Sequence, residues 1–574
     1  MNIDPSTKYP AFPQVPLQNR SWPDNTLTEA PRWCSVDLRD GNQALIEPMG
    51  LERKLRMYQL LLAVGFKEIE IGFPAASQTD FDFVRHLIDN DLVPDDVTLQ
   101  VLTQARRALI ERTFEAMRGV PRAIMHVYNS TSTLQRRVVF NLDRAGIKKI
   151  ATEGADIVAE CAAKQNDTDW LFEYTPESFT GTELDYAVEV CDAVTAIWQP
   201  TPERQVILNL PATVEMSTPN IHADQIEWFK RHIHKGENIC LSLHPHNDRG
   251  CAVAATELGL LAGANRVEGT LFGNGERTGN VDIVTLALNL FSQGVDPKLD
   301  FSDIYNVITT AEHCNQLPVH PRHPYAGELV FTAFSGSHQD AIKKGFAAMR
   351  KSNSPVWEVP YLPIDPADLG RTYEAVIRVN SQSGKGGVAF IMERDHGLEL
   401  PRRMQIEFSG VVQEISEKTG REVESSAIRE AFETSFIQAT SPVHFQRHSS
   451  VEDEQDENLR TLTAFIEVDG LEVTLTGQGN GPIDAYVNAL TQHFGIDFRV
   501  VDYHQHTTGI GADAQSASYV EIQVGKGETR YGAALHSNIV SASLIAVSCA
   551  FNRAVSAGLI DTSTTGKTNS GNKV

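Results

Sequence analysis

The feature that most constrains this chain is an alternation of short apolar runs and amphipathic stretches, repeated eight times between residues 32 and 294. Each repeat opens with a β-branched run and continues with apolar residues at three- and four-residue spacing, the period of a helix. Strict alternation of strand and helix indicates a parallel sheet. Eight such units over about 260 residues match the (β/α)₈ TIM barrel. The predicted strands are 32–40, 68–74, 98–104, 122–129, 169–177, 205–213, 239–247 and 266–273, and the clearest helices are 51–65, 185–198, 221–233 and 282–294.

A doubly wound open sheet is the structural alternative. The count of eight units, and the absence of a GxGxxG motif after the first predicted strand, disfavour it.

Beyond residue 300 the rhythm changes. Residues 300–370 are helical in pattern and interrupted by prolines, 371–380 predicts a strand, and 403–437 is helical again. The acidic stretch 448–460 has the composition of a linker. The last hundred residues predict a β/α repeat, with helices near 482–494 and 538–556 and with 477–485 and 532–543 as equivalent strand-to-helix turns. The predicted domains are an N-terminal arm (1–30), the barrel (31–305), helical and mixed linker subdomains (306–437) and an α+β domain (438–574).

Composition excludes several classes of partner. The chain has 50 lysine and arginine residues against 74 aspartate and glutamate residues, a formal charge of −24, which argues against nucleic acid or an anionic membrane as the main partner. No apolar window is long enough for a transmembrane helix, and the proline-rich start predicts an extended arm rather than a signal peptide. Seven dispersed cysteines without a CxxC motif are typical of reduced thiols, so we expect a cytoplasmic protein.

Polar residues gather at the carboxyl ends of the predicted strands, where TIM barrels place their active sites. Each one alone is weak evidence because strand ends are often polar, but the clustering predicts a functional site. The set is Arg39, Asp40, Gln104, His126, Glu177, Thr213, His244, His246, Asn274 and Glu276.

The HPH motif at 244–246 is the strongest element of this set. Residues i and i+2 of a strand point to one side, so His244 and His246 can converge on one ion. Asp40 ends the first predicted strand, a next-but-one neighbour of the seventh in a closed barrel. Imidazoles combined with carboxylate and amide oxygens suit Mg²⁺, Mn²⁺ or Zn²⁺, and the sequence does not choose among them. The alternative is a pair of surface or core histidines near a turn.

Arg39 and Glu177 are candidates for the chemistry itself. A guanidinium beside a metal site can stabilise an enolate or alkoxide oxygen, although Arg39 could instead form an ion pair with Asp40 or Glu177. Glu177 could act as a general base or in a proton relay, and a solvated glutamate at a strand end is the alternative.

Three segments carry a family resemblance. LRDGNQ (38–43) with Lys54, LSLHPHNDRGCAVA (241–254) and GNGERTGN (273–280) resemble signatures of the 2-isopropylmalate synthase and homocitrate synthase family. The segments span the predicted barrel, and the downstream domains are similar to those of the longer members, which catalyse the first committed step of leucine biosynthesis.

The resemblance implies an acyl transfer in which acetyl-CoA, 3-methyl-2-oxobutanoate and water give 2-isopropylmalate and CoA. It assigns a divalent metal, with Mg²⁺ favoured, to Asp40, His244, His246 and Asn280, and it makes Arg39 the oxyanion stabiliser. It places Glu177, Thr213 and His126 against the 2-oxo acid and its proton relay. His338 is similar to a catalytic histidine supplied by a partner subunit, which implies a homodimer. We add Gln104 as a substrate contact and Asn274 and Glu276 near acetyl-CoA; the base stays open among Glu177, His338 and a relayed water.

The C-terminal domain resembles the family's leucine-sensing domain, so leucine is the expected allosteric effector. The candidate leucine contacts are Gly509, Gly511, Ala514 and Asn538, where glycines would let backbone amides approach a carboxylate. A tight-turn role is the alternative for each glycine. Coupling between the leucine site and the barrel would be allosteric, through 371–437.

Several other functions remain possible at this point. Homocitrate, citramalate and methylthioalkylmalate synthases differ in the 2-oxo acid they use. Lyases and biotin-dependent carboxylases share the barrel and the ligands. A catalytically inactive metal-binding amino-acid sensor belongs to a different class, and it would not need both Arg39 and Glu177.

Overall fold

The computed structural model describes residues 4–371, 385–419, 423–452, 456, 459–508, 514–525 and 527–562. The chain forms two compact units, Met1–Phe331 with Ile364–Tyr373, and Thr332–Pro363 with Glu374–Val574. The finer domain boundaries at 306 and 438 remain predictions.

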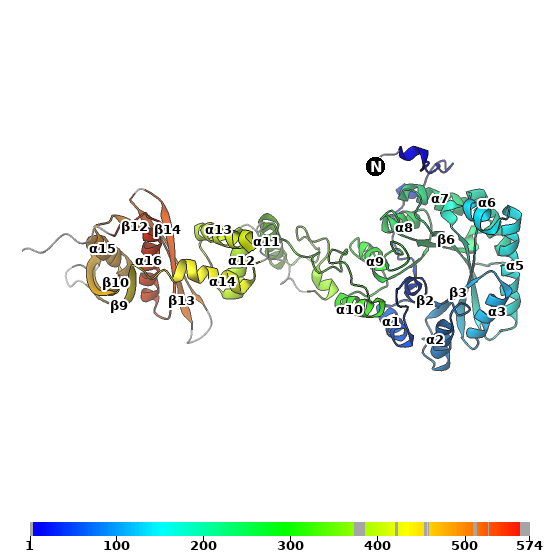
Figure 1. Cartoon of the computed structure of the whole chain (residues 1–574), viewed down its shortest axis with the longest axis horizontal. Helices are drawn as coiled ribbons and strands as arrows, with labels where there is room; N and C mark the ends of the chain where they lie inside the picture. Colours follow the sequence, from blue (N-terminus) through cyan, green and yellow to red (C-terminus); the bar gives the residue numbers. More distant parts are fainter. Residues whose placement is uncertain are drawn as a thin grey trace, which may run out of the picture. The chain divides into compact units, whose positions relative to one another are not determined.

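The first unit is a closed barrel of eight strands in sequence order, and every neighbouring pair is parallel. This confirms the predicted TIM barrel. Figure 1 shows the helices around the strands. The strands are β1 (Arg32–Ser35), β2 (Glu68–Gly72), β3 (Thr98–Gln104), β4 (Arg122–Ser130), β5 (Asp169–Glu177), β6 (Val206–Ala212), β7 (Ile239–Pro245) and β8 (Arg266–Gly269).

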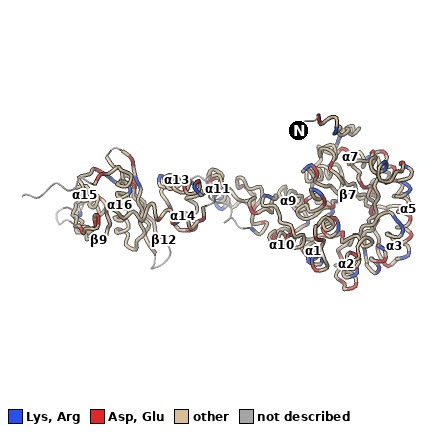
Figure 2. Tube along the Cα trace, in the orientation of Figure 1, with Lys and Arg blue, Asp and Glu red and all other residues tan. Residues whose placement is uncertain are grey.

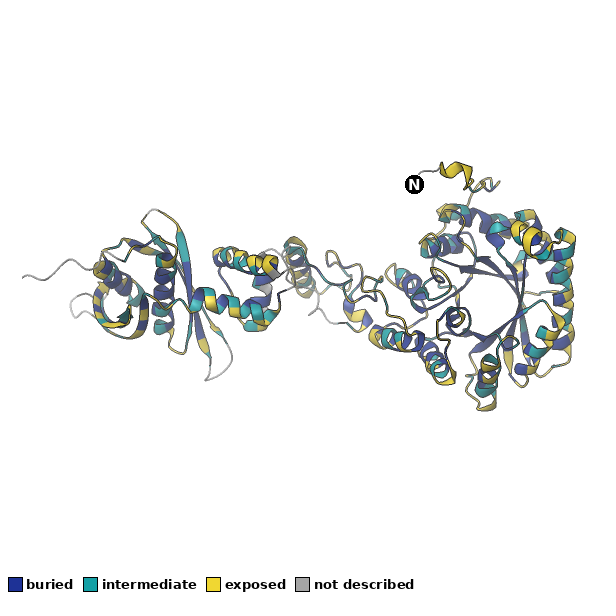
Figure 3. Ribbon diagram, in the orientation of Figure 1, coloured by how far each residue is buried: buried dark blue, intermediate teal, exposed yellow. Residues whose placement is uncertain are grey.

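The outer helices are amphipathic, as their spacing predicts. α1 (Leu51–Val64), for example, buries Met57, Leu61 and Val64 against the barrel and leaves its opposite face to solvent. Figure 3 shows this division, with buried strands inside and exposed faces on the outer helices. The other main helices of the unit are α2 (Gln78–Asp89), α3 (Arg107–Ala116), α5 (Arg144–Ala163), α6 (Leu184–Trp198), α7 (Pro219–His232), α8 (Ala252–Leu261), α9 (Ile283–Phe291) and α10 (Ile304–Asn315).

The first strand is shorter than predicted. It ends at Ser35, and the π-helical turn η3 (Asp37–Gly41) follows it. The Gly41 amide donates to the Val36 carbonyl at 3.1 Å, which closes this wide turn. Asp37 anchors the turn, because its carboxylate accepts hydrogen bonds from the Ser35 hydroxyl (2.8 Å) and the Leu271 amide (3.1 Å). Short polar side chains that bond to nearby backbone end a strand in this way.

The N-terminal arm lies on α7 of its own barrel. Arg20 makes two hydrogen bonds to Asp224, at 2.7 and 2.6 Å, and the Trp22 indole donates to the same carboxylate at 2.9 Å. Ser21 binds Glu227, one turn along α7. The two acidic residues of α7 thus fix the arm.

The second unit combines helices with two antiparallel sheets. The helices α11 (Gly336–Ser352), α12 (Lys385–His396), α13 (Arg402–Thr419) and α14 (Ser425–Phe432) precede two copies of a three-strand-and-helix motif. The sheets have the orders β11-β10-β9 and β12-β13-β14. Their elements are β9 (Val443–Glu452), β10 (Arg460–Val468), β11 (Leu471–Gly479), α15 (Pro482–Phe494), β12 (Phe498–Thr508), β13 (Gln515–Val524), β14 (Thr529–His536) and α16 (Ile539–Ser556).

The C-terminal repeat is confirmed, with one correction. Residues 448–452 belong to β9, which pairs with β10, so the linker interpretation of 448–460 is wrong for this part. The side chains of this half of β9 are exposed or half-buried, which explains its linker-like polar composition. The predicted strand 371–380 lies, apart from Arg371, outside the described residues.

α16 is long and apolar enough to cross a membrane, but 61% of it is buried inside the second unit. Its Val547, Ala550 and Phe551 belong to a core that also contains Leu462 of β10 and Val520 of β13. The helix is therefore apolar because it is packed between the two sheets.

Candidate active site and metal centre

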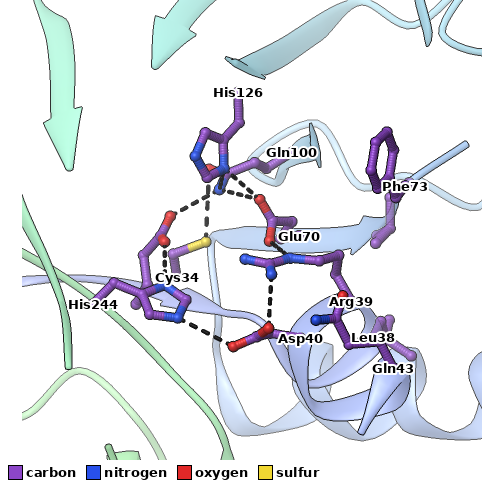
Figure 4. Close-up of polar contacts among 12 residues, drawn as sticks. Cys34, Leu38, Arg39, Asp40, Gln43, Glu70, Phe73, Gln100, His126 and His244 are labelled. Carbon is purple, nitrogen blue, oxygen red and sulfur yellow. Dashed lines mark hydrogen bonds and ion pairs between the residues drawn. The ribbon is translucent and has the colours of Figure 1, made fainter. Parts of the chain in front are cut away.

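Three predicted metal ligands converge at the carboxyl end of the barrel. Asp40 lies on the turn η3, His244 near the end of β7, and His246 directly after that strand. The Asp40 Oδ2 atom is 3.2 Å from His244 Nε2 and 3.6 Å from His246 Nε2. One ligand atom from each of the three buried residues lies within 4.8 Å of the others. Figure 4 shows Asp40 and His244 pointing toward each other.

Asn280 stands beside this group. It forms a backbone bridge with His246, and its Nδ2 donates to the Asn274 carbonyl at 3.0 Å. Its Oδ1 is buried and has no hydrogen-bond partner among the described residues. A buried amide oxygen without a partner carries a free-energy cost that a cation would remove. The donor set of one carboxylate, two imidazoles and this oxygen fits a divalent ion.

The electrostatics of the histidines differ. Burial lowers the pKa of His244, but hydrogen bonds with Asp40 and Glu268 outweigh it and raise the pKa to about 9. Burial and the neighbouring His244 lower the pKa of His246 to about 4. Burial would raise the pKa of Asp40, yet Arg39 and His244 hold it well below its ordinary range. Glu268 lies 2.7 Å from His244 Nδ1, which leaves Nε2 to face the centre.

Arg39 forms ion pairs on two sides. It donates through Nη1 to Asp40 Oδ1 at 2.8 Å and through Nε to Glu70. The other oxygen of Glu70 lies 2.7 Å from His126 Nδ1, and His126 Nε2 lies 2.7 Å from the Thr175 hydroxyl. Figure 4 shows this chain from Asp40 through Arg39 and Glu70 to His126. The predicted ion pair with Asp40 is present, whereas the second carboxylate is Glu70 rather than Glu177.

Glu70, Glu173 and Glu268 are buried acids that the sequence reasoning missed. Each lies in a strand between two apolar residues of the chain. An acid at such a position was the sequence signal that could have indicated a buried polar network. Burial and the adjacent Glu268 raise the pKa of Glu173 well above its ordinary range. Arg266 contacts Glu268 at 2.9 Å and compensates the charge of the network.

A pocket of about 240 Å³ opens beside the predicted metal ligands. Eight of the predicted residues line it, namely Arg39, Asp40, His126, Glu177, Thr213, His244, His246 and Glu276. Lining residues that the sequence reasoning missed are Gln43, Phe73, Leu102, Tyr128, Thr175, Asn209, Pro211 and Arg277. Most of them come from the same strand ends, but apolar and amide side chains give no distinct signal in a single sequence.

Two of the predicted contacts, Gln104 and Asn274, do not line the pocket but bind residues next to it. The Gln104 amide donates to the Tyr128 hydroxyl at 3.1 Å, so Gln104 supports a lining residue. The Asn274 carbonyl accepts from Asn280, and its side chain donates to the Gly41 carbonyl at 3.1 Å. Glu177 accepts a hydrogen bond from the Ser130 hydroxyl, and the Thr213 hydroxyl accepts from the Ser178 amide at 2.9 Å.

The remaining candidates lie in the second unit. His338 is exposed on α11 and stacks on Tyr361, with ring centroids 4.0 Å apart. Asn538 is the N-cap of α16. Ala514 directly precedes β13, whereas Gly509 and Gly511 lie outside the described residues.

Glycines near the two equivalent turns serve packing. A Cβ at Gly477 would lie 2.2 Å from the Ala485 carbonyl of α15, and one at Gly532 would lie 2.3 Å from the Ala546 carbonyl of α16. Each third strand therefore approaches its helix backbone in the same way. The absence of a side chain at these two glycines permits this close helix–strand packing.

Comparisons with known proteins agree with this architecture. The HMGL-like family matches residues 30–310, the alpha-isopropylmalate synthase, post-catalytic domain-like family matches 328–393, and the LeuA allosteric (dimerisation) domain matches 422–555. A 2-isopropylmalate synthase of Rhodospirillum rubrum is 60% identical over 553 residues, covering 96% of this chain and 99% of the relative. The enzyme of the same name from Pseudomonas putida is 56% identical over 556 residues, covering 96% and 98%. The chain belongs to the 2-isopropylmalate synthase family.

Proposed function

We propose that this protein is a 2-isopropylmalate synthase, which condenses acetyl-CoA with 3-methyl-2-oxobutanoate and water to give 2-isopropylmalate and CoA. The observation that carries the proposal is the convergence of Asp40, His244 and His246 beside Arg39 in one pocket. The identity to relatives of that name over nearly the whole chain supports the choice of reaction.

Asp40, His244, His246 and Asn280 are the proposed holders of a divalent ion, for which Mg²⁺ is our first choice and Mn²⁺ or Zn²⁺ the alternatives. A bound divalent ion supplies Lewis acidity, which polarises the keto carbonyl of the 2-oxo acid. Glu268 orients His244 for this task through the 2.7 Å contact to Nδ1.

Arg39 is the proposed oxyanion stabiliser. As the carbon–carbon bond forms between the acetyl methyl carbon and the keto carbon, negative charge develops on the keto oxygen. A guanidinium fixed beforehand by Asp40 and Glu70 offsets this charge without reorganising. His126 and Thr213 line the same pocket and are the proposed contacts of the 2-oxo acid.

Glu177 is the proposed base that removes a proton from the acetyl methyl group. It lines the pocket, and the Ser130 hydroxyl fixes its orientation. His338 of a partner subunit is the alternative base. Water then cleaves the thioester to release CoA. Glu276, at the pocket rim beside Gln43, is a proposed contact of acetyl-CoA, with Asn274 as its support.

Regulation and assembly are proposed from the domain matches. The LeuA allosteric (dimerisation) domain match over 422–555 supports leucine as an inhibitor and a homodimer as the assembly. Free thiols at all seven cysteines, each within the described residues, are compatible with the cytoplasm as its location. Charges of both signs alternate over the outer helices, and no nucleic-acid or membrane partner is proposed (Figure 2).

Thiol release from acetyl-CoA tests the proposal directly. The purified protein is assayed with Mg²⁺ and a panel of 2-oxo acids, with and without leucine. We expect CoA release with 3-methyl-2-oxobutanoate and less release when leucine is present. Preferred use of 2-oxoglutarate or pyruvate would identify a homocitrate or citramalate synthase instead. No release with any 2-oxo acid would overturn the synthase assignment and favour a metal-binding sensor.

A further inference from the structure

Lys54 is a charged residue buried in the wall of the barrel, on α1, with no exposed surface. Its Nζ lies 2.8 Å from Asp80 Oδ1, 3.0 Å from the Leu38 carbonyl and 3.4 Å from the Ile71 carbonyl. A lysine ammonium has three hydrogens to donate, and these three acceptors use all of them.

The two carbonyls belong to the chain neighbours of Arg39 and of Glu70. Leu38 directly precedes Arg39 on the turn η3, and Ile71 directly follows Glu70 on β2. Arg39 lines the pocket and forms an ion pair with the buried Glu70. One ammonium therefore joins the backbone beside Arg39 to the backbone beside Glu70.

Asp80 extends the connection to a third segment. Its Oδ1 pairs with Lys54, while its Oδ2 accepts from the Phe73 amide at 2.8 Å. Phe73 lines the pocket. A Cβ at Gly72 would lie 2.8 Å from Asp80 Cγ, so the absence of a side chain there lets Asp80 reach the loop.

Stability alone does not account for a lysine at this place. Burial lowers the pKa of Lys54, and the Asp80 carboxylate opposes that shift. The attraction between the two charges therefore partly offsets the cost of removing the ammonium from water. Replacing a buried ion pair with apolar residues of similar volume is often neutral or stabilising. What an apolar residue cannot do is hold two carbonyls at a set distance.

We propose that Lys54 is a positioning residue, whose ammonium fixes the turn that carries Arg39 and Asp40 against the end of β2. Asp80 holds the ammonium in place and fixes the Phe73 loop. The role rests on the proposed function, since it matters through the orientation of Arg39 toward the developing oxyanion. It also acts on Asp40, which shares the turn, and hence on the metal centre.

Four variants separate positioning from stability. Lys54→Met leaves the Asp80 carboxylate without its cation and is expected to lower the unfolding temperature. Lys54→Met/Asp80→Asn removes both charges, so the unfolding temperature is expected to recover. Its kcat should nevertheless stay about tenfold to a hundredfold below the wild type, because small misplacements of catalytic groups are costly. The KM for the 2-oxo acid should change much less than kcat.

Two further variants, Arg39→Gln and the triple variant Arg39→Gln/Lys54→Met/Asp80→Asn, complete a thermodynamic mutant cycle. If Lys54 acts through Arg39, adding Lys54→Met/Asp80→Asn to the Arg39→Gln variant should lower its kcat only slightly further. Full kcat in Lys54→Met/Asp80→Asn would overturn the positioning role. The positioning role would also be overturned if the fold-loss of kcat in the triple variant equalled the product of the losses in Arg39→Gln and in Lys54→Met/Asp80→Asn.

Mn²⁺ affinity gives a readout independent of turnover. Displacement of Asp40 should weaken Mn²⁺ binding by Lys54→Met/Asp80→Asn about tenfold, and an unchanged affinity would count against the proposal. Lys148→Met/Glu189→Gln is the matched control, since Lys148 and Glu189 pair at 2.5 Å between α5 and α6, outside the pocket lining. Absence of turnover in the wild type would contradict the synthase assignment, while the Mn²⁺ comparison would still decide the role of Lys54.

Discussion

Asp40 contacts three different cationic or proton-donating groups. One of its oxygens accepts from Arg39, and the other faces both His244 and His246. A carboxylate with such neighbours stays ionised, since Arg39 and His244 hold its pKa well below the ordinary range against the effect of burial. Asp40 thus links Arg39, the proposed oxyanion stabiliser, to His244 and His246, the other two clustered metal-ligand candidates.

His246→Ala should abolish turnover while leaving the fold intact. Of the three clustered ligands, His246 has the weakest ties to the protein, because its Nδ1 is buried without a partner among the described residues. Removing its ring should therefore cost metal affinity rather than core packing. CoA release and Mg²⁺ affinity measure the loss, and circular dichroism checks the fold. His313→Ala, on the exposed face of α10, is the control. Retained turnover in His246→Ala would remove the metal assignment.

His222 gives a pH-dependent prediction for stability. Burial lowers the pKa of His222 from its ordinary 6.5 to about 4, and Gln225 opposes only part of this shift. Between these values the unfolded chain binds a proton that the folded chain does not, so stability falls as pH drops from 6.5 toward 4. The full effect is about 3 kcal/mol.

The free energy of unfolding, measured in urea at several pH values, tests this prediction. His222→Leu should show a smaller decrease between pH 6.5 and pH 4 than the wild type, whereas His313→Gln should follow the wild type. Equal slopes in His222→Leu and the wild type would show that His222 does not titrate in this way.

Elements with regular patterns were predicted well, and the exceptions have physical causes. β3 and β5 begin and end where the apolar spacing predicts. β1 does not, because Asp37 turns the chain into η3 through bonds to Ser35 and to Leu271, a partner remote in sequence. Residues 448–452 form a strand because pairing with β10 outweighs their polar, linker-like composition.

The same distinction holds for the candidate site. His244 and His246 were found because their spacing matches the period of a strand. Glu70 and Glu268 were missed because one acid between apolar strand residues is a weak signal, and their partners, Arg39 and His244, lie on other elements.

The start of α16 offers a prediction for a single element. Asn538 accepts hydrogen bonds from the Val540 and Ser541 amides at 3.0 and 2.9 Å. Asn538→Ala should cost about 1 kcal/mol, the usual value for a lost N-cap, and Asn538→Asp should restore most of it. Urea unfolding of the second unit measures both. If Asn538 also contacts leucine, leucine inhibition should weaken in both variants. If Asn538 is only a cap, inhibition should weaken in Asn538→Ala and recover in Asn538→Asp together with stability. An Ala variant as stable as the wild type would contradict the capping role.

At the scale of the whole molecule, the two compact units each have a core of their own. The barrel carries the proposed metal ligands and the pocket, whereas the second unit carries His338 and the proposed leucine contacts. A single sequence could indicate both units, since their periodicities differ. It could not test the prediction that His338 acts at a partner subunit, because that depends on assembly rather than on local pattern.

Two units with separate ligands should unfold in two transitions that respond to different additions. A ligand that binds only the folded state stabilises its own unit, by about 2.7 kcal/mol at a concentration of 100 times Kd. In scanning calorimetry we therefore expect Mg²⁺ with 3-methyl-2-oxobutanoate to raise the transition of the barrel, and leucine to raise that of the second unit. His246→Ala should lose the first shift and keep the second, which assigns the transitions. The opposite result would be that leucine raises only the barrel transition, the one whose Mg²⁺-dependent shift is lost in His246→Ala. Leucine would then bind the barrel, and its inhibition would be competition at the pocket rather than allostery.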